Sequence, residues 1–186
     1  FYHPGNIVVS VAGNVSQEKV NRAVAGFFQG KESREKKTFV PADTKGQGPF
    51  VRVENRDTKQ ANIALGFPGY PRLHPRRYAL DLLDVILGQG MSSRLFQEVR
   101  VQRGLAYSVG SQYSPHFDTG ILRIYAGVDP EKGKDAVGVI LEQLAGIREA
   151  SVTRDELRMA KDFYKGSLSL RLEDTLSLAL RHGGHM

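Results

Sequence analysis

Hydrophobic residues recur along this chain in two patterns, one typical of strands and the other of helices. Residues 6–12 form a short, nearly continuous apolar run between two glycines, which predicts a buried strand. Asn14 and Ser16 are possible N-caps, and apolar residues then recur at helical spacing up to Phe28, just before Gly30. The beginning of the chain therefore predicts one strand followed by one helix.

The periodicity disappears after this helix. Residues 31–49 are polar and charged, and they include both prolines and glycines. A stretch of this length without secondary structure is uncommon inside a compact domain. We therefore predict three segments: a strand–helix unit at 1–30, a linker at 31–49 and a larger unit at 50–186.

Beyond the linker, strand and helix patterns occur in pairs. Alternation and β-branched residues predict strands at 50–56, 61–67, 105–113 and 119–128, with the last two forming a hairpin. Helical spacing predicts helices at about 76–87, after Ser92 or Ser93, and at 130–150, 154–170 and 173–181. Asp129 followed by Pro130 marks one helix start, and a capping box of Thr153 with Glu156 marks another. This order predicts an α+β fold of two layers, with an antiparallel-rich sheet and helices packed on one face.

Composition is typical of a globular protein, with 40% hydrophobic and 25% charged residues among 186. No apolar run approaches the roughly 18 residues of a membrane span. The net charge of +6 raises nucleic acid as a partner, but Lys and Arg are interspersed with Glu and Asp. Tyr107, Tyr113 and Tyr125 on the predicted hairpin could stack on bases, yet no RNA-recognition motif accompanies them. We therefore expect no nucleic-acid partner and no membrane span.

The chain contains no cysteine, which excludes disulfides, thiolate catalysis and cysteine-bound zinc. This absence, with no visible signal peptide, favours a cytoplasmic location. The chain begins at Phe1 without an initiator methionine and ends in a helical pattern. Both ends look truncated, which weakens any expectation about targeting.

None of the five histidines belongs to a helical zinc motif, either H-E-x-x-H or H-x-x-E-H. His182 and His185 are spaced as H-x-x-H, but two glycines between them would break the helix that orients them. Two ligands without a third do not make a zinc site, so we predict no metal in this chain. A nucleophile elbow of the G-x-S-x-G type is also absent.

The remaining candidate chemistry lies in residues 88–111. Arg100, on a short predicted helix, and Tyr107, on the following strand, are seven residues apart across a break at Gly104. A guanidinium and a phenol can both donate hydrogen bonds to a carbonyl or an oxyanion. From spacing alone, the better explanation is that Arg100 is a surface residue of the helix and Tyr107 a cross-strand packing residue.

The residues themselves carry more information than their spacing. The stretch LGQGMSSRLFQEVRVQRGLAYSVGS resembles the signature of the C-terminal half of M16-family zinc peptidases, the group related to mitochondrial processing peptidase and pitrilysin. FYHPGNIVVSVAGNVS is similar to the closing strand–helix of the family's first half, and TKQANIALGFPG is similar to the opening of the second. DTGILRIYAGVDPEK and TRDELRMAKDFYKGSLSLRLED continue the resemblance to the end of the chain. The nearest match is the shorter, bacterial-type subfamily.

The resemblance implies a peptidase of the inverted-zincin type that encloses peptides between two homologous halves. In this family, the first half carries H-x-x-E-H with a downstream glutamate, holds zinc and activates water. The second half supplies an arginine and a tyrosine that contact the substrate near the scissile bond. Arg100 and Tyr107 match that pair in residue type, spacing and surroundings.

This chain departs from the complete family pattern because it lacks H-x-x-E-H. We therefore expect it to be inactive alone and to need a zinc-bearing half or partner chain, with peptide or protein as substrate. Residues 1–30 would be the closing unit of that first half. We hypothesise that its strand–helix at 6–30 completes the second half's sheet, in the same molecule or by a swap in a homodimer. The alternative function is a non-catalytic scaffold subunit of the same fold.

Overall fold

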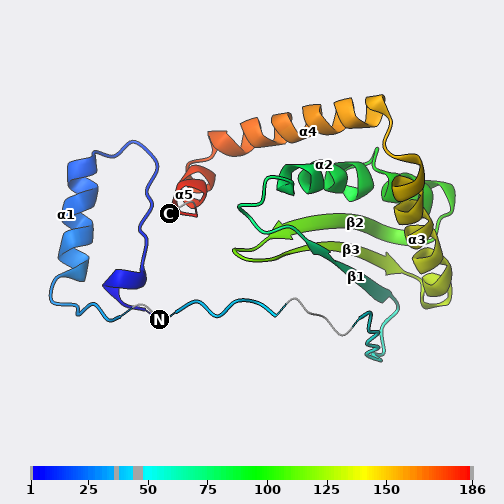
Figure 1. Ribbon diagram of the computed structural model, residues 1–186, viewed down its shortest axis with the longest axis horizontal. Coiled ribbons are helices and arrows are strands. Elements are labelled where there is room, and N and C mark those ends of the chain that lie inside the picture. The colour runs from blue at the N-terminus through cyan, green and yellow to red at the C-terminus, as the bar shows by residue number, and fades with distance from the viewer. Residues whose placement is uncertain (1, 36–37, 44–47, 185–186) are drawn as a thin grey trace. The chain divides into compact units, whose positions relative to one another are not determined.

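The computed structural model describes residues 2–35, 38–43 and 48–184 of the chain (Figure 1). The chain divides into two compact units. One comprises Pro41–Tyr164, and the other comprises Phe1–Val40 together with Lys165–Met186. The first boundary falls inside the predicted linker, whereas the second falls within a helix.

The larger unit contains a three-stranded antiparallel sheet (Figure 1). Its strands are β1 (Ala61–Gly69), β2 (Ala106–Pro115) and β3 (Gly120–Val128), in the order β1-β3-β2. The hairpin predicted from the pattern is confirmed, because β2 and β3 pair from Ala106 opposite Val128 to Pro115 opposite Gly120. β1 alternates along its whole length and β3 alternates as far as Ala126, as expected for a sheet that buries one face.

The buried face of the sheet packs against helices α2 (Arg77–Gly88) and α3 (Gly133–Ala150) and the short helix η2 (Phe96–Gln102). Every second residue of β3 is buried: Leu122, Ile124, Ala126 and Val128. The helices contribute the buried residues Leu87, Leu95, Val99, Ala136, Val139 and Ile140. Because these side chains form one contiguous cluster on one side of the sheet, the α+β fold with helices on one face is confirmed for this unit.

Helix α4 (Arg154–Glu173) lies outside α2 and adds a layer that the two-layer prediction did not include (Figure 1). Val85 and Ile86 of α2 are buried with Ala160 of α4, on the side of α2 away from the sheet. The predicted capping box begins α4: the Thr153 amide donates to Glu156 at 2.8 Å, and the Glu156 amide donates to the Thr153 hydroxyl at 3.2 Å. Asp129 likewise caps η3 (Pro130–Lys132), which leads directly into α3.

The second unit contains η1 (Pro4–Asn6), α1 (Gln17–Phe28) and α5 (Thr175–Gly183). Ser16 caps α1, as predicted, and Asp174 caps α5 through the Ser177 amide at 2.7 Å. Neither helix has a buried residue in the part of the chain that the structure describes. This unit therefore has helices but little core of its own.

Two predicted strands are wrong. Residues 6–12 and 50–56 are not strands, and the described sheet contains only β1, β3 and β2. Their apolar side chains are instead exposed, including Val8 (56%), Val51 (90%) and Val53 (77%). A strand exists only when a neighbour accepts and donates its backbone hydrogen bonds, and neither segment has such a neighbour here. The proposed completion of the sheet by residues 6–30, in the same molecule or by a swap between copies, and the assignment of residues 1–30 stay predictions.

Candidate functional site

Arg100 lies on η2, a π-helix whose inner side is anchored in the core. Leu95 and Val99 are fully buried, whereas Arg100 is exposed. Its guanidinium carbon lies 5.0 Å from the centre of the Phe96 ring, four residues earlier. This cation–π contact orients the guanidinium without neutralising it. The helix type was not predicted, and π-helices occur often at functional sites.

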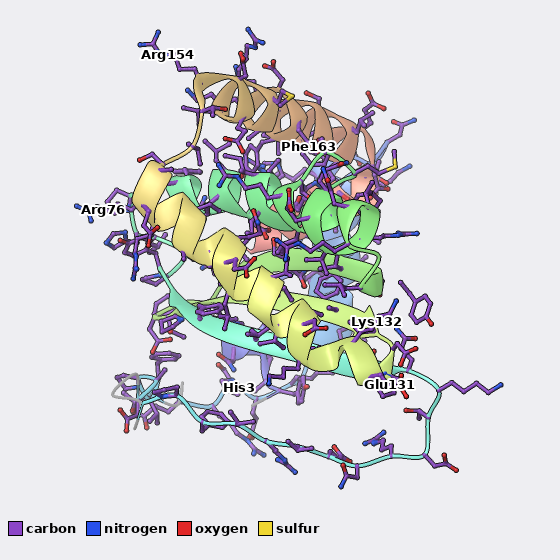
Figure 2. The ribbon with its side chains drawn as sticks, turned by 90° about the vertical axis from the view of Figure 1, so that its right-hand side faces the viewer. His3, Arg76, Glu131, Lys132, Arg154 and Phe163 are labelled. Atoms are coloured by element: carbon purple, nitrogen blue, oxygen red, sulfur yellow. The ribbon has the colours of Figure 1, made fainter. Side chains whose placement is uncertain are left out.

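A glycine turn joins η2 to the strand that carries Tyr107. Gly104 has φ of +57°, a left-handed conformation that only glycine adopts readily. The Leu105 amide donates to the Val99 carbonyl at 2.8 Å, which closes the end of the helix. Lys132, at the start of α3, donates to the Gly104 carbonyl at 3.1 Å (Figure 2). The turn is therefore fixed both by its own backbone and by a neighbouring helix.

Tyr107 stands at an irregularity in β2. The register of β2 against β3 shifts between Ala106 and Ser108, which makes Tyr107 the extra residue of a β-bulge. Ala106 points into the core at 9% exposure, and Tyr107 is 64% exposed. A bulge redirects a side chain without moving the rest of the strand, so Tyr107 points to solvent although its neighbour Ala106 faces the core.

The structure presents both predicted residues to solvent on consecutive elements of the larger unit. In the described part of the chain, they form no hydrogen bond with each other, and neither is paired with a carboxylate. Arg100 carries a permanent positive charge and several N–H donors, and Tyr107 offers one hydroxyl. Both donors are therefore available to an acceptor that is not in this chain.

The sheet surface beyond Tyr107 carries a cation that the sequence analysis did not single out, and an aromatic ring that it considered only for stacking on bases. Arg123 and Tyr125 alternate with the buried residues of β3 and are exposed. The Arg123 guanidinium donates to Gln112 Oε1 at 2.9 Å and to Ser114 Oγ at 3.4 Å, both on β2. The sequence contained a signal for this exposed surface. Side chains alternate between the two faces of a strand, so Arg123 and Tyr125 lie on the face away from the core-facing Ile124.

A buried carboxylate connects the elements around the candidate site on the core side of the sheet. Asp84 of α2 is 2% exposed, and its Oδ1 accepts from the Ser111 hydroxyl at 2.5 Å. Its Oδ2 accepts from the Tyr113 amide at 3.0 Å and from the Gln89 side chain at 2.5 Å. These bonds join α2, β2 and the loop that leads to η2. The sequence signal for this network was an acidic residue within the otherwise apolar end of a helix. The sequence-based prediction did not include it.

The start of η2 is tied to α4 by an ion pair. Arg94 donates to the two carboxylate oxygens of Glu156 at 2.7 and 3.0 Å, and the two side chains are only 21% and 24% exposed. The hydrogen bond from Arg94 is the largest cause that lowers the pKa of Glu156 from 4.5 to about 2, with further bonds from Thr153 acting in the same direction. Burial opposes this shift more weakly. The same hydrogen bond raises the pKa of Arg94.

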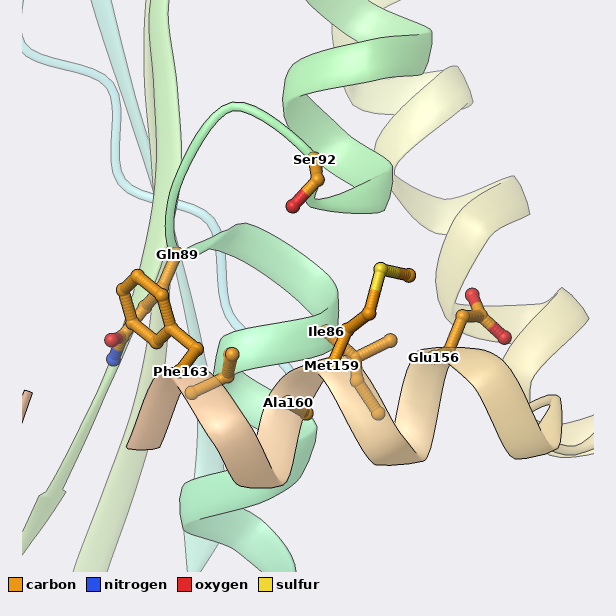
Figure 3. A pocket seen from close by; sticks show the side chains of 8 residues that line it. Ile86, Gln89, Ser92, Glu156, Met159, Ala160 and Phe163 are labelled. Atoms are coloured by element: carbon orange, nitrogen blue, oxygen red, sulfur yellow. The ribbon is translucent and has the colours of Figure 1, made fainter. Parts of the chain in front are cut away.

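A pocket lies between α2 and α4 (Figure 3), and neither Arg100 nor Tyr107 lines it. It is lined by Val85, Ile86, Gln89, Ser92, Glu156, Met159, Ala160 and Phe163. The space is about 40 Å³, which is enough for a few water molecules and too small for a peptide. The candidate site is therefore the exposed surface around Arg100 and Tyr107.

The described residues do not fit a metal ion. Nowhere in residues 2–35, 38–43 and 48–184 do three His, Cys, Asp or Glu side chains converge. His182 lies in α5, while His185 falls outside the described residues. No described helix is long and apolar enough to cross a membrane.

Comparisons with known proteins agree with this picture of a non-catalytic half. The family model for the peptidase M16 inactive domain matches residues 1–164. An uncharacterized zinc protease of Streptomyces coelicolor is 39% identical over 188 residues, covering 98% of this chain and 41% of the relative. The uncharacterized zinc protease YmxG of Bacillus subtilis is 39% identical over 183 residues, covering 98% of this chain and 44% of the relative.

A crystal structure of a protease from Helicobacter pylori superposes with a TM-score of 0.79 at 22% identity, covering 90% of this chain and 42% of that one. At this identity, the likeness concerns the fold alone. The chain spans less than half the length of the two curated relatives. The family match over most of the sequence and the close relatives along nearly all of it lead to one conclusion: the chain belongs to the M16 peptidase family, as an inactive C-terminal domain.

Proposed function

We propose that this chain is the substrate-binding half of an M16-type zinc peptidase. In this proposal, Arg100 and Tyr107 donate hydrogen bonds to a bound peptide next to the bond that is cleaved. The zinc and the residues that activate water belong to another half, in the same longer protein or in a partner chain. This division of roles is consistent with relatives that are named zinc proteases and are more than twice as long as this chain.

The observation that carries the proposal is the way the two donors are presented. Arg100 stands on a helix anchored by Leu95 and Val99, and Tyr107 stands in a bulge fixed by the sheet register. The turn between them is held by Lys132. A pure surface residue needs no such support, whereas a catalytic donor gains from preorganisation because it need not reorganise as charge develops.

The chemical role follows from the two side chains. When a peptide bond is attacked, negative charge builds on its carbonyl oxygen, and fixed N–H or O–H donors stabilise that charge. Arg100 supplies a charged donor, and Tyr107 supplies a neutral one. Either can also hold a neighbouring backbone carbonyl and so fix the register of the peptide.

The proposal predicts that removing either donor slows peptide cleavage by the full-length protein, or by this chain mixed with its zinc-bearing half. Loss of one preorganised donor typically lowers kcat by about 10²–10³-fold. We expect a loss of this order for Arg100→Ala, and a smaller loss for Tyr107→Phe, which removes one hydroxyl. Steady-state kinetics with a fluorogenic peptide would measure both.

Arg158→Ala is the matched control, because Arg158 is an exposed arginine of the same unit whose partner is Asp155 on its own helix. It should retain the parental rate. Full activity in both Arg100→Ala and Tyr107→Phe would show that the assigned roles are wrong. A parental complex with H-x-x-E-H present but no peptidase activity would favour the scaffold alternative.

A further inference from the structure

The open face of the sheet has a regular arrangement that extends away from Tyr107. Four rows of residues cross the strands with β3 in the centre: Asn62–Gly127–Ser108, Ala64–Tyr125–Gly110, Gly66–Arg123–Gln112 and Pro68–Ile121–Ser114. Tyr107 lies beside the first row. Arg123 is the single charged residue among these twelve positions, all of which the structure describes.

The side chains around Arg123 leave it accessible. On the β1 side its neighbour is Gly66, over which the apolar Ile121 side chain lies, and the next row offers Ala64. On the β2 side, Gln112 and Ser114 accept hydrogen bonds from the guanidinium. Both acceptors are neutral, so they orient the cation without cancelling its charge. No ion pair involves Arg123 in the described part of the chain.

Tyr125 separates Arg123 from the end of the sheet that carries Tyr107. A side chain at Gly110 would meet the Tyr125 hydroxyl at 2.6 Å, so the ring lies across β2. The ring is 50% exposed and provides an apolar surface on this face. A chain lying along the sheet would therefore pass the phenol of Tyr107, then an aromatic surface, then a fixed guanidinium.

The separation between Tyr107 and Arg123 along the sheet can be expressed as a number of strand residues. Ser108, next to Tyr107, pairs with Gly127, and Arg123 is four residues further along β3. At about 3.3 Å per residue, four residues of strand correspond to about 13 Å. An extended peptide advances by the same length in four residues.

We propose that Arg123 is a specificity-determining residue that binds an acidic side chain of the peptide, about four residues from the scissile bond. This inference rests on the proposed function, because it takes Tyr107 as the marker of the cleaved bond. An arginine held by neutral acceptors on one side presents its remaining N–H donors to a carboxylate, which it binds more strongly than it binds a neutral amide.

The test compares pairs of peptides that differ only by Glu or Gln, placed four residues before or four residues after the cleaved bond. The full-length protein, or this chain with its zinc-bearing half, should show a kcat/KM for the Glu peptide about tenfold higher at one of these positions. The preference should shrink as ionic strength rises. Arg123→Gln should bring the ratio close to one.

Charge reversal separates a specificity role from a structural one. Arg123→Glu should prefer Lys over Glu at the same peptide position, an outcome that misfolding cannot produce. Arg158→Gln removes a positive charge elsewhere in the same unit and should leave the Glu/Gln ratio unchanged. Circular dichroism of each variant would confirm the parental fold.

The outcomes distinguish this inference from the function on which it rests. If Arg100→Ala abolishes cleavage and Arg123→Gln leaves the Glu/Gln ratio unaltered, the assignment of Arg123 is wrong and the proposed function stands. If Arg100→Ala and Tyr107→Phe leave cleavage unaltered, the proposed function fails and the inference fails with it. An equal Glu/Gln ratio in the parent at both positions would also overturn the inference.

Discussion

Asp84 shows how a single residue can be constrained by partners that are distant in sequence. Its carboxylate accepts bonds from Ser111 and Tyr113, 27 and 29 residues away, and from Gln89 in the adjoining loop. A buried carboxylate without a cation is tolerated when hydrogen bonds replace its water. The identity of Asp84 is visible in the sequence, but these acceptors and donors meet only because β2 packs against α2.

Glu156 links stability to pH. Its pKa is about 2 in the folded chain, mainly because of Arg94, against an ordinary value of 4.5. A group whose pKa is lowered by folding stabilises the fold above its unfolded pKa and loses that contribution as pH falls toward its folded pKa. We expect Glu156→Gln to cost about 1–2 kcal/mol at pH 7, after allowance for solvent screening.

The pH profile distinguishes the charge from the cap, because glutamine can still form the capping box. The difference in unfolding free energy between parent and Glu156→Gln should therefore shrink between about pH 4.5 and pH 2, as measured by urea unfolding. Glu149→Gln, at an exposed pair with Arg148, is the control and should change stability by less than about 0.5 kcal/mol. A difference that stays constant down to pH 2 would contradict the role given to the charge.

Helices and strands with strong local signals were predicted well. The capping box of α4, the N-cap of α1 and the β2–β3 hairpin all depend on residues close together in sequence. The π-helix at η2 and the bulge at Tyr107 were not predicted. Both are departures from a regular period, and they form because Leu95 and Val99 must reach the core while β2 keeps its register with β3.

The turn between η2 and β2 gives a prediction for one element. Gly104 has φ of +57°, and a Cβ there would meet no atom within 4 Å. Gly104→Ala therefore introduces backbone strain without a clash, at a cost of about 1–2 kcal/mol. It should also displace Tyr107. The resulting loss of kcat in the zinc-bearing complex should be larger than the loss of stability alone would explain.

Gly138→Ala is the matched control for this substitution. Gly138 lies within α3, a Cβ there also meets nothing within 4 Å, and its φ is helical rather than left-handed. The change should stabilise the chain by about 0.5–1 kcal/mol, because alanine favours the helix. Thermal unfolding would compare the two variants; equal effects of the same sign would mean that the strain at Gly104 is absent.

The distribution of buried residues over the chain gives the last prediction. Val128 is fully buried in the sheet core, whereas Val51 is 90% exposed in a segment predicted to be a strand. We expect Val128→Ala to cost about 2–3 kcal/mol through lost burial and the cavity it leaves. Val51→Ala should cost less than about 0.5 kcal/mol. A similar loss in both variants, measured by urea unfolding, would place residues 50–56 in a packed strand.

The sequence by itself determined the family, the α+β class, most helices and the hairpin, because each depends on local periodicity, caps or a specific motif. It also singled out Arg100 and Tyr107 as candidate site residues, and their roles stay a proposal. Only the tertiary structure decided that residues 6–12 and 50–56 remain unpaired, since strand pairing needs a partner that periodicity cannot name. It also decided that Tyr107 is turned outward by a bulge. Arg123 lies four residues along β3 from the partner of Ser108, because register is a property of two strands together.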